Sequence, residues 1–166
     1  MPKVKAKFKE LAAFNRKLQI LASDAETIMR WSLYDGAAVA ANAMRASIGG
    51  LRTVSDAESL QAYRRRQPAI LSVRQKAGLL GGLGIAPMKG TTDGVNVRIG
   101  FDGYNDIRTE RWPNGQPNIM IAASCEHGSS AMLEQPFIRP AFESARGTIV
   151  DAMEETAHKK IEEILG

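Results

Sequence analysis

The sequence has few of the residues from which catalytic and metal sites are built. Among its 166 residues there are one cysteine, Cys125, and two histidines, His127 and His158. A single cysteine excludes a disulfide bond within the chain and supplies too few thiolates for a structural zinc site. His158 falls in a segment expected to be a solvated helix, which argues against a two-histidine metal site. We therefore expect no metal, no cofactor and a reducing compartment.

Long apolar runs are also missing. No stretch approaches the roughly 18 apolar residues of a membrane-spanning helix, and the N-terminus lacks the apolar segment of a secretory signal. The chain is nevertheless 44% hydrophobic and 24% charged, which is typical of a folded protein. We expect one domain over residues 1–166, no membrane partner, and a protein that stays where it is made or leaves within an assembly.

Acidic residues are scarce at the front of the chain and concentrated at its end. Residues 1–20 hold six basic residues and one acidic residue (6 − 1 = +5), and residues 52–76 hold six basic and two acidic residues (6 − 2 = +4). Residues 151–163 hold two basic and five acidic residues (2 − 5 = −3). Such polarity suits head-to-tail contacts between copies, and a basic end also suits DNA. The alternative is that each cluster is a solvated helix face.

The basic residues that would face DNA fall in two groups. Residues 1–8 are interpreted as a flexible basic arm, with an ordinary solvated terminus as the alternative. The candidates are Lys3, Lys5, Lys7, Lys9, Arg64, Arg65 and Arg66. Few aromatic residues accompany the arginines, which argues against recognition of single strands by stacking.

Apolar spacing predicts a long helical segment over residues 9–48, formed by one bent helix or by two in series. Its stripe, expected to pack on the chain's own sheet, is Leu11, Phe14, Leu18, Leu21, Ala25 and Ile28, followed by Ala37, Ala40, Ala41 and Met44. Ser23 and Glu26 form a potential capping box. Gly36 interrupts the pattern at a cost of about 1 kcal/mol relative to alanine.

The middle of the chain predicts weaker helix over residues 55–77, interrupted at Pro68. The glycines that follow do not match a nucleotide-binding loop, because neither the dinucleotide nor the P-loop spacing is present. A sheet is then expected over residues 83–124. Its three predicted strands are Leu83–Met88, Val95–Phe101 and Asn118–Ser124. The linkers between them have turn composition without helical periodicity, which favours antiparallel pairing.

A terminal helix is predicted over residues 140–165, with one apolar face and Pro140 in its first turn. The fold class expected is therefore α+β: a long N-terminal helix and a C-terminal helix packed on a small antiparallel sheet of about three or four strands.

Two groups of residues invite a chemical interpretation. On a strand, Cys125 and His127 would share a face as a thiol and an imidazole, but no third orienting group or oxyanion donors can be identified. Asp102, Asp106 and Glu110 lack the order of a calcium-binding loop and are better interpreted as solvated acids. We expect no catalytic residues and no enzyme activity.

The most distinctive segment joins Glu126-His127-Gly128 to Pro136-Phe137-Ile138-Arg139-Pro140. Proline has a fixed φ and no amide donor, so each proline fits the first turn of a helix. Between them, Phe137 is expected to be buried and Arg139 to carry a charge in need of a partner. The segment therefore predicts a stiff turn rather than a catalytic site.

The order of several motifs resembles the minor tail proteins of long-tailed bacteriophages, also described as tail-completion or head-tail joining proteins. The resemblance covers roughly residues 8–165. The motifs are Asp35-Gly36-Ala37, Gly84-Ile85-Ala86-Pro87, Val95-Asn96-Val97-Arg98-Ile99-Gly100-Phe101-Asp102-Gly103-Tyr104-Asn105, Glu126-His127-Gly128-Ser129-Ser130 and Pro136-Phe137-Ile138-Arg139-Pro140-Ala141. The chain departs from the family pattern at His127, usually aromatic, and at Gln135, often basic.

The resemblance implies a virion structural protein of the head-tail junction or tail end, assembled in the host cytoplasm. Its partners would be further copies of itself in a ring such as a hexamer, other neck and tail proteins, and passing DNA bound without sequence preference. Glu126 and Gly128 would shape a strand end, Pro136 and Pro140 would fix the turn, and Phe137 would anchor it. Arg139 would pair with an acid in its own or the next subunit. The competing function is a basic nucleic-acid-binding module without catalytic activity.

Overall fold

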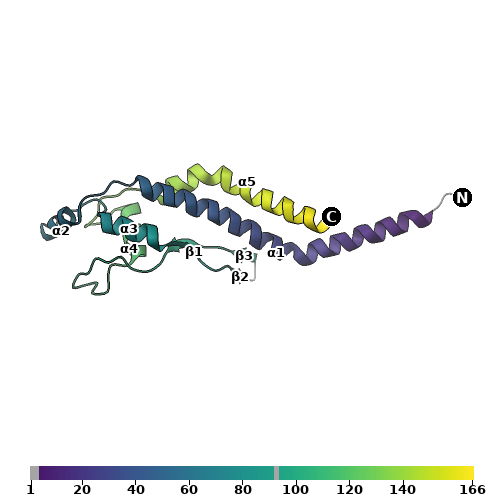
Figure 1. Cartoon of the computed structure of the whole chain (residues 1–166), viewed down its shortest axis with the longest axis horizontal. Helices are drawn as coiled ribbons and strands as arrows, with labels where there is room; N and C mark the ends of the chain where they lie inside the picture. Colours follow the sequence, from purple (N-terminus) through teal and green to yellow (C-terminus); the bar gives the residue numbers. More distant parts are fainter. Residues whose placement is uncertain (1–3, 92–93) are drawn as a thin grey trace.

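A single long helix, α1 (Val4–Gly50), organises the molecule. The computed structural model describes residues 4–91 and 94–166, and in it α1 runs along most of the long axis (Figure 1). At 1.5 Å per residue its 47 residues span about 70 Å. The helix bends without breaking, so the first of the two sequence alternatives is confirmed. The capping box predicted at Ser23 is wrong, because that hydroxyl donates to the Ile20 carbonyl within the continuous helix, at 2.8 Å.

The terminal helix, α5 (Ile138–Leu165), packs antiparallel on α1. Where they cross, a side chain on Gly36 would place Cβ 2.6 Å from Cγ of Met153. Beside it, Thr156 donates from Oγ1 to Oδ2 of Asp35 at 2.6 Å. The glycine that weakens α1 locally is thus explained by the close approach of α5, which begins two residues earlier than predicted.

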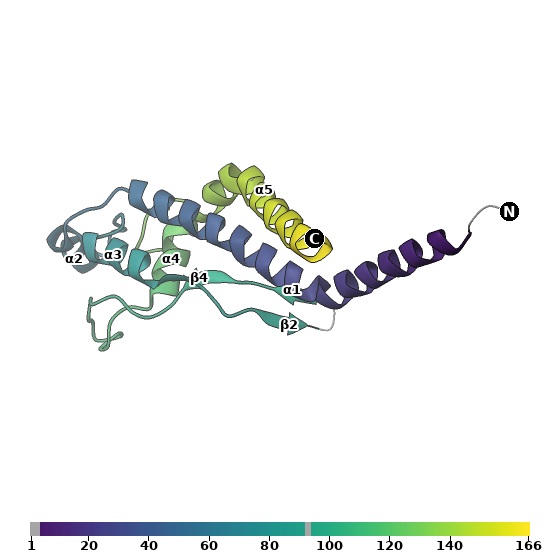
Figure 2. The same cartoon turned by 45° about the vertical axis from the view of Figure 1, so that its right-hand side comes forward.

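The strands form one interrupted hairpin on the other side of α1 (Figures 1 and 2). β1 (Leu83–Ile85) pairs antiparallel with β4 (Ile99–Phe101), and β2 (Lys89–Thr91) with β3 (Gly94–Asn96). The α+β class with small antiparallel sheets is therefore confirmed, as four strands in two pairs.

The third predicted strand is wrong, because Asn118–Ser124 belongs to a helix, α4 (Asn118–His127). Its buried residues are Asn118, Ile121, Ala122, Cys125 and Glu126, which recur at helical spacing. A short apolar run does not distinguish a buried strand from a buried helix. The buried positions of α4 include the polar Asn118 and Glu126, so the apolar pattern of the sequence did not reveal their helical spacing. The sheet consequently ends at Phe101 and does not extend to residue 124.

The weaker helical region consists of α2 (Asp56–Arg64) and α3 (Val73–Gly82), separated around Pro68 as expected. Each starts with a complete capping box, from Ser55 in α2 and from Ser72 in α3. Gly78 and Gly82 lie inside α3, where a Cβ atom would fall 2.6 Å from the side-chain amide of Asn118. These glycines therefore permit close contact between α3 and the start of α4.

The main core lies where the inner half of α1 meets α3, α4, the hairpin and the start of α5. Its members with almost no solvent exposure are Phe137, Met44, Ile48, Leu71, Leu79 and Cys125. Within residues 4–91 and 94–166, no helix is both long enough and apolar enough to cross a membrane.

Candidate functional site

The Glu126 carboxylate, at the end of α4, caps the start of α5. Its Oε2 accepts from the backbone N–H of Phe137 at 2.6 Å and of Ile138 at 2.8 Å, and its Oε1 accepts from Arg139 at 3.0 Å. The local N-cap residue supplies no side-chain hydrogen bond of its own. A carboxylate from a neighbouring helix therefore satisfies donors that a helix start leaves unpaired, and its charge suits the positive end of the helix dipole.

The ionisation of Glu126 follows from these contacts. Burial raises the pKa of this carboxyl, but the backbone donors of Ile138, Phe137 and Arg139, helped by His127, outweigh it and leave the pKa below its ordinary value. The side chain is 8% exposed. Glu126 is therefore a buried, ionised cap.

The turn between α4 and α5 is fixed by backbone contacts. Gly128 ends α4 with φ at 74°, a conformation that glycine adopts without strain. The backbone N–H of Gln135 donates to the Cys125 carbonyl at 2.7 Å. The Gln135 side chain also accepts from the backbone N–H of Arg52 at 3.1 Å and donates to the Arg52 carbonyl at 3.0 Å. Gln135 thus ties this turn to the segment after α1.

The two prolines and Phe137 behave differently from one another. Phe137 is buried, as expected, and meets the ring of Phe101 edge-on with centroids 5.9 Å apart. Pro140 is the third residue of α5, where no intrahelical donor is needed. Pro136 precedes the N-cap residue Phe137, so its expected place in the first turn is wrong. Glu126 and Gly128 shape a helix end and not a strand end.

Arg139 contributes its backbone and not its guanidinium to the turn. Its side chain is exposed, and it makes no hydrogen bond or ion pair with any residue in the described part of the chain. No acidic residue in the described part of the same chain is therefore the partner of the Arg139 side chain. A partner in the next subunit stays a prediction.

The thiol and imidazole do not form a dyad. Cys125 and His127 lie on a helix, where two residues apart means about 200° of rotation, so the shared face expected for a strand is absent. Burial, followed by the charge of Glu126, raises the pKa of Cys125 to about 11. This thiol donates to the Gln135 carbonyl at 3.5 Å. At neutral pH it is a protonated core residue.

The acids of the long loop are either paired with an arginine or not grouped with other metal-ligating side chains. Asp106 accepts from Nε of Arg74 at 2.8 Å, and this contact lowers the pKa of Asp106. Among the residues that the structure describes, no three His, Cys, Asp or Glu side chains are grouped so as to hold a metal ion.

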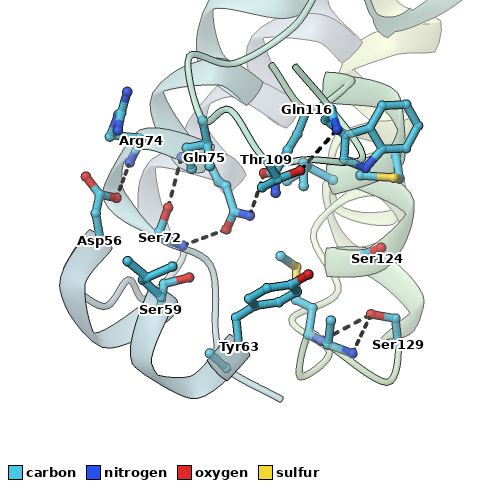
Figure 3. A pocket seen from close by; sticks show the side chains of 18 of the residues that line it. Asp56, Ser59, Tyr63, Ser72, Arg74, Gln75, Thr109, Gln116, Ser124 and Ser129 are labelled. Carbon is cyan, nitrogen blue, oxygen red and sulfur yellow. Dashed lines mark hydrogen bonds between the residues drawn. The ribbon is translucent and has the colours of Figure 1, made fainter. Parts of the chain in front are cut away.

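A groove of about 630 Å³ separates α2 from α4 and from the loop that precedes α4 (Figure 3). Apolar side chains make up much of its lining: Leu60, Tyr63, Ile70, Ile107, Trp112, Met120 and Met132. Some of its polar groups are paired with one another, as where Gln75 donates to Gln116 at 3.0 Å. The groove therefore offers apolar contact area. The sequence did not indicate it, because its walls come from two segments, residues 56–75 and 107–132, that are 32 positions apart (107 − 75).

The first turns of α1 extend past the rest of the molecule (Figures 1 and 2). We call residues 10–20 the overhang. Every side chain in it is exposed, including Leu11 at 54%, Phe14 at 58% and Leu18 at 47%. The expectation that this stripe packs on the chain's own sheet is therefore wrong for the overhang. The end of α5 reaches only as far as Lys17, whose Nζ donates to the Leu165 carbonyl.

The two basic clusters lie at opposite ends of the molecule (Figure 1). Arg64, Arg65 and Arg66 are exposed at the end of α2. Lys5, Lys7 and Lys9 belong to the first turns of α1, while Lys3 lies outside the described residues. The flexible arm predicted for residues 1–8 is not found from Val4 onward, where the backbone is helical. In the described part of the chain, the backbone of the first turns of α1 and the end of α2 lie at opposite ends of the molecule.

Comparison of the chain with protein-family models, with curated proteins and with solved structures found no match.

Proposed function

We propose that this protein is a structural subunit of a phage virion, at the head-tail junction or tail end, that acts by self-assembly and by docking on other neck and tail proteins. The observation that carries the proposal is the overhang, a helical segment with three large apolar side chains left in solvent. The motif order described above supports the phage assignment. The subunit would join a ring, such as a hexamer, and assemble in the host cytoplasm before the virion leaves.

The energetics of the overhang favour an assembly. A free helical segment this short is marginal in water, because most helical stability in proteins comes from packing of an apolar face. Covering the exposed halves of three such side chains contributes roughly 2–4 kcal/mol before the cost of association. A second chain or another virion protein would therefore cover the exposed apolar side chains of the overhang.

Mass measurement and electron microscopy together test this proposal. We expect oligomers whose population rises with concentration, and tails that lack a component at the end when the protein is omitted. Because a partner can nucleate assembly, a monomer in dilute solution agrees with the proposal if the protein still joins tails. A protein that stays monomeric at high concentration and binds neither tails nor connectors would contradict it.

The competing function, a nucleic-acid-binding module, is favoured by the exposed arginines that end α2. These arginines lie at the opposite end of the molecule from the basic start of α1, so the two clusters do not act together. We therefore expect weak, non-specific binding of DNA. A filter-binding series across salt distinguishes the two functions, since contacts with phosphate alone weaken steeply as salt rises. Tight duplex binding at physiological salt would favour the module over the structural subunit.

A further inference from the structure

The apolar face of the overhang continues the face of α1 that α5 covers further along. Ile28 and Gly36 follow Leu11, Phe14 and Leu18 at spacings that keep one side of a helix. At Gly36 this side meets Ile149 and Met153 of α5. Since α5 stops beside Lys17, Leu11 and Phe14 lie beyond the end of α5 and Leu18 lies beside it.

A second, partly open face runs along α5 itself. Val150, Glu154, Ala157 and Ile161 recur at 4-3-4 spacing, which places them on one side of the helix. That side is distinct from the one that carries Ile149, Met153 and Thr156 toward α1. Val150 is 45% exposed, and Ala157 and Ile161 are half-buried. We call these four residues the open face of α5.

Resting on the assembly proposed above, we infer that the overhang of one copy docks on the open face of α5 in a second copy. Charge favours this pairing: the overhang sums to +1 (2 − 1) and the whole of residues 1–20 to +5, whereas residues 151–163 sum to −3 and Glu154 lies on the open face itself. Two overhangs placed side by side would instead bring like charges together, which is unfavourable.

The spacing of the apolar residues also agrees between the two faces. Leu11 and Leu18 are seven residues apart, as are Val150 and Ala157, so each pair spans about 10 Å along its helix. The contact joins unlike surfaces and leaves the pair with one free overhang, on one copy, and one free open face, on the other. Repetition of such a contact produces a ring if the rotation closes.

Cysteine cross-linking between two differently tagged full-length variants tests the contact. One carries Leu11→Cys and the other Val150→Cys, and the buried, protonated Cys125 is left in place. Within one chain these positions cannot meet, because Val150 follows Ile149, which packs at Gly36, 25 residues along α1 from Leu11, or roughly 38 Å. A disulfide needs Cβ atoms about 4 Å apart. Any Leu11→Cys to Val150→Cys bond is thus between copies.

The matched control is Thr148→Cys, which is exposed on the same helix but about 200° from Val150. Under mild oxidation we expect the mixed species with Val150→Cys to form at least tenfold more than the one with Thr148→Cys, and its yield to fall several-fold at high salt. Equal yields from both, no mixed species, or only Leu11→Cys homodimers would overturn the inference. If wild-type protein nevertheless oligomerises or joins tails, the proposed function stands while this contact fails. If it does neither, both fail.

Discussion

Individual residues in the α4–α5 turn have structural roles that can be predicted only in part from their residue types. The burial of Phe137 was predictable, because an aromatic ring between two prolines before an amphipathic helix is expected to pack in the core. The role of Glu126 was not, since its three backbone partners lie 11 to 13 positions further along the chain. No local spacing rule relates a carboxylate at the end of one helix to the start of the next.

Replacing Glu126 by alanine is expected to lower the free energy of unfolding by about 1–3 kcal/mol, because buried backbone donors lose their acceptor. Glu126→Gln, which keeps one acceptor oxygen, should cost less. Denaturant unfolding of the three proteins measures the difference. An unchanged midpoint in Glu126→Ala would show that water replaces the carboxylate without cost.

The same residue predicts a pH dependence. Its pKa is lower in the folded protein than in the unfolded chain, so its stabilising effect is fully present above the unfolded pKa, near 4.5. It is lost as pH falls through the folded value, because in that range the unfolded chain binds a proton that the folded protein does not. Thermal melts from pH 7 down to pH 3 should show a steeper loss for wild type than for Glu126→Gln. Parallel curves would count against an ionised cap.

Gly36 offers a test of the α1–α5 crossing. Gly36→Ala should destabilise the protein by about 1–3 kcal/mol through overpacking against Met153, despite alanine's higher helix propensity. In a Met153→Ala background, the same change should become neutral or stabilising. A double-mutant cycle by chemical denaturation measures this coupling, and additive effects would contradict the close approach.

At the scale of elements, the sequence predicted the helices and the hairpin better than the middle of the chain. The predicted strand Val95–Phe101 is divided in the structure into β3 and β4, which pair with different strands. Ser55 and Ser72 cap α2 and α3. The run Asn118–Ser124 forms a helix although its sequence predicts a strand, because a short continuous apolar run is compatible with either a buried strand or a buried helix. The groove and the overhang depend on which elements are neighbours in space, and no single segment carries that information.

The overhang predicts an element-scale experiment. Phe14→Ser should leave the melting temperature within about a degree, because this side chain packs on nothing in the monomer, yet weaken self-association about tenfold. Ile20→Ser, at an exposed apolar position on the other side of the helix, serves as the control and should leave association unchanged. Sedimentation velocity over a concentration series gives both values. Equal effects of the two changes would mean that the stripe is not the contact.

For the molecule as a whole, the distribution of charge is more informative than its sum. A formal net charge of +4 is modest for 166 residues. The structure places one basic cluster at the outer end of α1 and the other at the end of α2, with the acidic end of α5 closer to the first (Figure 1). Contacts between copies should therefore depend on ionic strength.

Raising salt from 50 to 500 mM is expected to reduce self-association several-fold, since screening shortens the reach of the opposed charges. Replacing Arg64, Arg65 and Arg66 together by glutamine should leave this effect in place and reduce only DNA binding. Light scattering measures self-association and filter binding measures DNA binding on the same samples, so the two effects can be separated. Loss of self-association in the arginine variant would place the interface at α2 instead.

The contact between Asp35 and Thr156 joins positions 121 residues apart. During synthesis α1 is made well before α5, so the face of α1 that α5 covers stays open until α5 has been made. Folding of the body is consequently completed only after α5 has left the ribosome. A nascent chain stalled before Ile138 should remain sensitive to protease over α1, whereas the released protein should be protected there.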